Sequence, residues 1–185
     1  MRRDGRPGDI PLRFPLIPAL LLFLASGCAT KAEELLPIPA AIKGASRVSE
    51  VEVSVRREAA AAVAAFDQNV GAGGEPFAKL IEKAVREAAA QAGLNSGRAL
   101  KLIVEVDALQ MASAGSALLG RDDRLEGSVF LRDAATGESL GQLYIDIDRN
   151  NGGLISALSR IGNVRESLAR QFGAEVAAAL SAPRR

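Results

Sequence analysis

The 185-residue sequence contains no histidine, no tryptophan and only one cysteine. Without an imidazole the chain cannot build a Ser-His-Asp or Cys-His nucleophile, and zinc sites made of histidines or several thiolates are excluded as well. The charges nearly cancel, with 23 basic against 22 acidic residues. This balance provides no basic surface of the kind that binds nucleic acid, so we expect no nucleic-acid partner. We expect no cofactor either.

A secretion signal is the clearest feature that the sequence does contain. Four arginines within the first 13 residues precede an apolar run over residues 14–25. This run is too short to span a bilayer, whose core requires roughly 20 apolar residues in a helix. We therefore predict that residues 1–27 form a signal peptide and take no part in the folded domain.

The only cysteine follows small residues at the end of this run, in Leu24-Ala25-Ser26-Gly27-Cys28. The stretch resembles the lipobox of bacterial lipoproteins, with Ala25 at a place where the family pattern prefers leucine. The resemblance implies cleavage between Gly27 and Cys28, thioether attachment of diacylglycerol to Cys28 and acylation of the new amino group. Two or three acyl chains anchor a protein stably, so Cys28 would be a membrane anchor. An ordinary signal peptide with an incidental Cys28 is the alternative.

Ala29 would be the second residue of the mature chain. In the lipoprotein family an aspartate there favours retention in the inner membrane, so Ala29 implies an outer-membrane location facing the periplasm. Removing residues 1–27 takes away four of the basic and two of the acidic residues, which leaves 19 basic against 20 acidic. With so little net charge, we expect the lipid rather than a basic surface to attach the chain to the membrane.

Residues 28–45 contain two prolines and a glycine without a sustained hydrophobic period, and we predict a flexible tether there. A single domain is expected over 46–182. Alternation of apolar and polar residues predicts its strands, and helical spacing with capping residues predicts its helices. The predicted strands cover 48–55, 100–106, 125–132 and 140–148, and the predicted helices cover 58–66, Pro76 to Gly93, and Asn163 to 180.

The resulting order is β-α-β-β-β-α. Its first strand, helix and strand imply a right-handed crossover and a parallel pair, whereas the segment from Asp133 to Gly137 predicts a hairpin turn. We therefore expect an α+β domain of two layers, a mixed sheet with its helices on one face.

Residues 46–182 also resemble small outer-membrane lipoprotein families with a domain of unknown function. The resemblance rests on a strand from Leu125, the Asp133-x-x-Thr136-Gly137 turn, a strand ending at Asp146–Arg149 and a closing amphipathic helix. It implies no catalytic residue.

Two motifs for ligand binding are incomplete. The glycines of 71–74 precede a helix but lack the lysine and hydroxyl residue of a phosphate-binding loop. Residues 146–152 begin like a calcium loop, but Asn151 stands where the turn requires glycine and Ala157 where a bidentate glutamate should close the shell. We therefore expect no metal site.

Two candidate sites remain. The first is a pair of carboxylates, because glycan hydrolysis needs only two of them at a fixed separation. The candidates are Glu105, Asp107, Asp146 and Asp148. The simpler interpretation is that these four side chains lie on the solvent-facing side of their strands. Leu118 and Leu119 lie in a predicted loop, where adjacent leucines either fold back over the sheet or bind a partner.

From these observations we expect a non-enzymatic, lipid-anchored module that binds another envelope protein. A glycan hydrolase and an auxiliary subunit of a transport complex are the alternatives.

Overall fold

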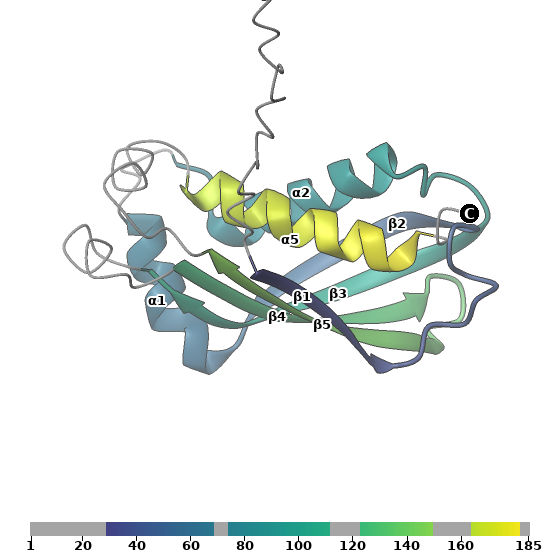
Figure 1. Cartoon of the computed structure of the whole chain (residues 1–185), viewed down its shortest axis with the longest axis horizontal. Coiled ribbons are helices and arrows are strands. Elements are labelled where there is room, and N and C mark those ends of the chain that lie inside the picture. Colours follow the sequence, from purple (N-terminus) through teal and green to yellow (C-terminus); the bar gives the residue numbers. More distant parts are fainter. Residues whose placement is uncertain (1–28, 69–73, 112–122, 150–163, 182–185) are drawn as a thin grey trace, which may run out of the picture.

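The computed structural model describes residues 29–68, 74–111, 123–149 and 164–181. It shows one five-stranded sheet in the order β1-β5-β4-β3-β2, with helices α2 and α5 over one face and helix α1 at one end of the sheet (Figure 1). The strands are β1 (Ala29–Leu36), β2 (Ser46–Val55), β3 (Arg98–Gln110), β4 (Asp123–Asp133) and β5 (Ser139–Arg149). The helices are α1 (Arg57–Gln68), α2 (Phe77–Gln91) and α5 (Val164–Leu180). The predicted α+β class with a mixed sheet is confirmed.

The sheet combines one parallel pair with three antiparallel pairs. Strands β2 and β3 run parallel and are joined through α1 and α2, as the strand-helix-strand pattern predicts. The pairs β3–β4, β4–β5 and β5–β1 are antiparallel. Strands β1 and β2 therefore form the two edges of the sheet.

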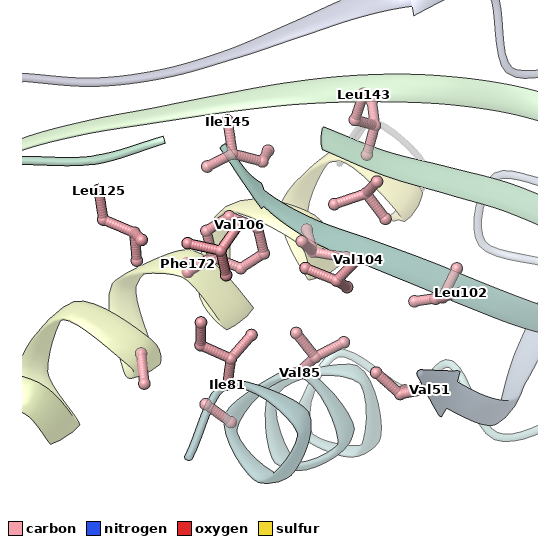
Figure 2. Close-up of a cluster of buried hydrophobic side chains, with 14 of the residues drawn as sticks. Val51, Ile81, Val85, Leu102, Val104, Val106, Leu125, Leu143, Ile145 and Phe172 are labelled. Carbon is pink, nitrogen blue, oxygen red and sulfur yellow. The ribbon is translucent and has the colours of Figure 1, made fainter. Parts of the chain in front are cut away.

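The hydrophobic core lies between the sheet and the helix layer. On β3, Leu102 and Val104 are fully buried, whereas Ile103 between them is only partly buried on the other face. Figure 2 shows side chains from the strands directed toward Ile81 and Val85 of α2 and toward Phe172 of α5. The alternation of apolar and polar residues in the sequence therefore corresponds to the two faces of the sheet.

Helices α2 and α5 approach each other closely because glycine stands at their contact. A Cβ atom at Gly173 of α5 would lie 2.5 Å from the carbonyl oxygen of Ala84 in α2. A second glycine makes room beneath α5, since a Cβ at Gly127 of β4 would lie 2.9 Å from the ring of Phe172. The missing side chains let two backbones and an aromatic ring pack at close range.

The turn between β4 and β5 forms as its residues predict. The Oδ1 atom of Asp133 accepts hydrogen bonds from the backbone N–H groups of Ala135 and Thr136, both at 2.8 Å. Gly137 has a φ of 74°. Arg98 Nε lies 2.5 Å from Asp133 Oδ2, and this contact together with the backbone donors lowers the pKa of Asp133 to about 2.

The start of α2 depends on a side chain from the preceding helix. Pro76, predicted at the first helical position, instead precedes the helix as its N-cap and offers no side-chain hydrogen bond. The carboxylate of Asp67, near the end of α1, accepts the N–H of Phe77 at 2.9 Å. At the other end, Gly93 has a φ of 78° and ends the helix as predicted. Asn163, predicted to cap α5, lies outside the described residues.

The flexible tether predicted over 28–45 is contradicted by the structure. Residues 29–36 form β1, and Ile38 and Ile42 behind it are buried in the core. The N–H of Gly44 donates to the carbonyl of Leu180 at 2.8 Å, which fixes this segment to the end of α5. The prediction failed because β1 joins the sheet through its backbone, while its side chains at 31–36 are exposed and show no hydrophobic alternation.

Candidate functional site

The sheet face opposite α2 and α5 carries the four candidate carboxylates. Glu105 and Asp107 project from β3, and Asp146 and Asp148 project from β5. Strand β4 lies between these two strands, so the four carboxylates form two groups rather than one cluster.

The β3 group is organised around Arg56, at the end of β2. Its Nη2 atom lies 2.7 Å from Glu105 Oε2, and its Nε atom lies 2.8 Å from Asp107 Oδ1. The other oxygen of Asp107 accepts a hydrogen bond from the Ser128 hydroxyl at 2.7 Å. The two carboxylates raise the pKa of Arg56, first through the hydrogen bond to Glu105. Both carboxylates are therefore held next to a permanent positive charge.

The β5 group is organised around Arg124 of β4. Its Nη2 atom lies 2.8 Å from Asp146 Oδ2, and its Nε atom lies 3.1 Å from Glu126 Oε1. The hydroxyl of Tyr144 donates a hydrogen bond to the other oxygen of Glu126. Burial, reinforced by the Glu126 carboxylate, raises the pKa of Tyr144 to about 12. Asp148 lies at the end of this row, and its Oδ1 atom is buried with no hydrogen-bond partner among the described residues.

Three of the four candidate carboxylates therefore form ion pairs with arginines. A glycosidase needs one carboxylic acid that keeps its proton beside one that does not. Here Glu105 and Asp107 share Arg56, and Asp146 contacts Arg124. In the described ranges, no group of three or more histidine, cysteine, aspartate or glutamate residues is arranged to hold a metal ion.

A hollow of about 520 Å³ runs along the free edge of β2, beside α2. Val51 and Val53 line it from the strand, and Ala78, Lys79 and Glu82 line it from the helix. Lys79 and Glu82 form an ion pair with the nitrogen and oxygen 2.7 Å apart. The two charged side chains that α2 contributes to this hollow are therefore paired with each other.

The anchoring residues predicted from sequence, Gly27 and Cys28, lie outside the described residues. The chain that follows them is described by the structure, since β1 begins at Ala29, the next residue. Ala29 pairs with Asp148 at the end of β5, and the pairing continues to Leu36. The predicted start of the mature chain thus coincides with the first strand of the sheet. No helix in the described part of the chain is both long enough and apolar enough to cross a membrane.

Leu118 and Leu119, the predicted partner-binding pair, also lie outside the described residues. The structure instead identifies a leucine pair that the sequence reasoning missed. Leu35 and Leu36, at the end of β1, are 49% and 50% exposed. The sequence signal for this pair was two adjacent leucines before Pro37, in a segment otherwise composed of alanine, threonine and charged residues.

Comparisons with known proteins give only distant similarities. The PelC dodecamer from Paraburkholderia phytofirmans is 12% identical, with 84% of this chain and 99% of that chain covered and a TM-score of 0.47. A DUF330 protein from Xanthomonas campestris is 16% identical over 73% of this chain and 82% of that one, with a TM-score of 0.46. A candidate lipoprotein from Caulobacter crescentus CB15 is 14% identical over 70% and 86%, with a TM-score of 0.37. The sequence matches no family description and no curated protein. Similarities at this level assign no family to the chain.

Proposed function

We propose that this chain is a lipoprotein of the outer membrane, anchored through Cys28 and facing the periplasm. The observation that carries the proposal is the position of β1, which begins at Ala29, one residue after the predicted lipid attachment. A cleaved signal peptide would therefore leave a mature chain whose second residue already belongs to the sheet. The lipobox resemblance at Leu24–Cys28 supports the same cleavage position.

The proposed role of the domain is to bind another envelope protein without catalysing a reaction. The sheet face that carries the carboxylates supports this role, because Glu105 and Asp107 are paired with Arg56 and Asp146 is paired with Arg124. These ion pairs hold the charges in fixed positions, which favours recognition of a partner protein over proton transfer.

Metabolic labelling with a fatty-acid analogue tests the anchor. The wild-type chain and Cys28→Ala are expressed in a bacterium with an outer membrane, and we expect label only in the wild type. Ala29→Asp is the matched control, since it keeps the lipid and should move the protein toward the inner-membrane fraction. Equal labelling of wild type and Cys28→Ala would overturn the proposal.

Incubation with purified peptidoglycan tests the absence of catalysis. We expect the purified protein to release no soluble fragments beyond those released by the double variant Glu105→Gln and Asp146→Asn. Release by the wild type that this double variant abolishes would instead establish the carboxylate-dependent hydrolase.

A further inference from the structure

Strand β1 leaves no tether between the anchor and the sheet. Ala29 pairs with Asp148, and Lys31 pairs with Asp146, in an uninterrupted antiparallel register. Consecutive Cα atoms are about 3.8 Å apart, so a lipid on Cys28 would hold the start of β1 directly at the bilayer surface. The domain cannot move away from the membrane as a domain on a long linker can.

At its other end, β1 carries a bulge that presents two leucines. The register shifts between Glu34, which pairs with Leu143, and Leu36, which pairs with Gln142, so that Leu35 has no partner on β5. A bulge bends its strand and redirects side chains, and it is common at sheet edges. Leu35 and Leu36 are each about half exposed, whereas Ile38, two residues later, is buried. The core therefore uses the isoleucine and leaves the leucine pair at the surface.

The charged side chains between the anchor and the leucine pair each belong to an ion pair. Lys31 Nζ lies 2.9 Å from Glu33 Oε2, and Lys43 forms an ion pair with Glu34. Two glutamates alone would be repelled by anionic lipid headgroups, but each has a lysine partner. The edge of β1 thus combines an attachment point, a neutral middle and an apolar end.

From this arrangement we infer that the β1 edge lies along the bilayer surface, with Leu35 and Leu36 inserted at the boundary between headgroups and acyl chains. At about 3.3 Å per residue, the leucine pair lies about 23 Å from Ala29. The lipid on Cys28 and the leucine pair then form two separate attachments, and two attachments fix the orientation of the domain on the membrane. The inference rests on the lipid anchoring proposed above.

Fluorescence quenching tests the contact cleanly because the chain contains no tryptophan. Leu36→Trp and Leu35→Trp each place one reporter on the β1 edge, and Glu87→Trp places one at an exposed position on α2. Helix α2 contacts β2 and α5 but not β1 within the described ranges, which makes Glu87→Trp the matched control. The full-length lipidated proteins are reconstituted into phosphatidylethanolamine and phosphatidylglycerol vesicles that carry bromine atoms on the acyl chains.

We expect bromine near the headgroups to lower the fluorescence of Leu36→Trp about twofold or more, and that of Glu87→Trp hardly at all, because interfacial side chains sit only about 5–10 Å deep. Leu35→Trp should behave as Leu36→Trp does. If the proteins float with the vesicles but the β1 variants are quenched no more than Glu87→Trp, the leucine contact is wrong while the anchor stands. If the proteins do not float with vesicles, the anchor itself fails. Circular dichroism verifies that each variant is folded.

Discussion

Arg165 at the start of α5 is held by Asp67 at the end of α1, although 98 residues separate them in sequence. The Arg165 Nη2 atom lies 2.5 Å from Asp67 Oδ1 and 2.7 Å from the carbonyl oxygen of Glu75. The guanidinium also lies 5.2 Å from the ring centre of Phe66. Since Asp67 accepts the N–H of Phe77 as well, one carboxylate connects the ends of three helices.

Replacing this carboxylate should destabilise the domain strongly. Asp67→Ala leaves the buried guanidinium of Arg165 without its ionic partner and the first turn of α2 without an acceptor. We expect a loss of about 2–4 kcal/mol in the free energy of unfolding, measured by urea denaturation. Adding Arg165→Met should recover part of the loss. If the double variant is as unstable as the sum of the single variants, the two residues are not coupled.

The contact between α2 and α5 should not tolerate a methyl group at Gly173. Gly173→Ala places a Cβ within 2.5 Å of the Ala84 carbonyl oxygen, and backbone atoms cannot rotate out of the way. Despite the better helix propensity of alanine, we expect a net loss of about 1–3 kcal/mol in thermal or denaturant unfolding. Ala178→Leu, at an exposed position of the same helix, is the control and should change stability little. A stabilised Gly173→Ala protein would contradict the close packing.

Stability at low pH should depend on Asp133. Its pKa of about 2 in the folded state is below the ordinary value of about 3.9, so the folded protein favours the charged form. The resulting stabilisation is present above about pH 4 and is lost as the pH falls toward 2. Asp133→Asn keeps an oxygen for the turn but cannot titrate, so its unfolding free energy should fall less steeply over this range. Glu138→Gln, which alters the more exposed partner of Arg98, should keep the wild-type slope.

Tyr144 is the only tyrosine in the chain, so its ionisation can be followed by ultraviolet absorbance alone. We expect a midpoint at about pH 12, and a loss of stability as the pH rises from about 10 to 12, because the unfolded chain releases the phenolic proton first. In Glu126→Gln the midpoint should fall but stay above the ordinary value, since burial is the larger cause of the shift. A wild-type midpoint near 10 would show that the hydroxyl is solvated.

The strands and helices predicted over 46–182 were recognisable because their side chains divide between core and solvent. Leu143, Ile145 and Ile147 are buried while Tyr144 and Asp146 are not, and this alternation is visible in the sequence. The same logic missed β1, because an edge strand held by backbone hydrogen bonds needs no apolar face. The pattern of side chains in a sequence does not predict hydrogen bonds that the backbone of an edge strand makes.

The candidate site was only partly predictable for a related reason. The sequence placed Glu105, Asp107, Asp146 and Asp148 on the polar face of their strands but could not supply the strand order. With β4 between β3 and β5, Glu105 and Asp107 contact Arg56, whereas Asp146 contacts Arg124. The adjacent residues Leu35 and Leu36 are visible in the sequence, but their exposure depends on the position of β1 at the edge of the sheet, which the local sequence does not predict.

The pairing of β1 with β5 also sets an order of events during folding. β1 is the first strand of the chain, yet its partner residues lie more than a hundred positions downstream. Until the segment that forms β5 has been synthesised, β1 has no strand to pair with in the described sheet. The β1 edge is therefore completed only after most of the chain has been made, although β1 is its first strand.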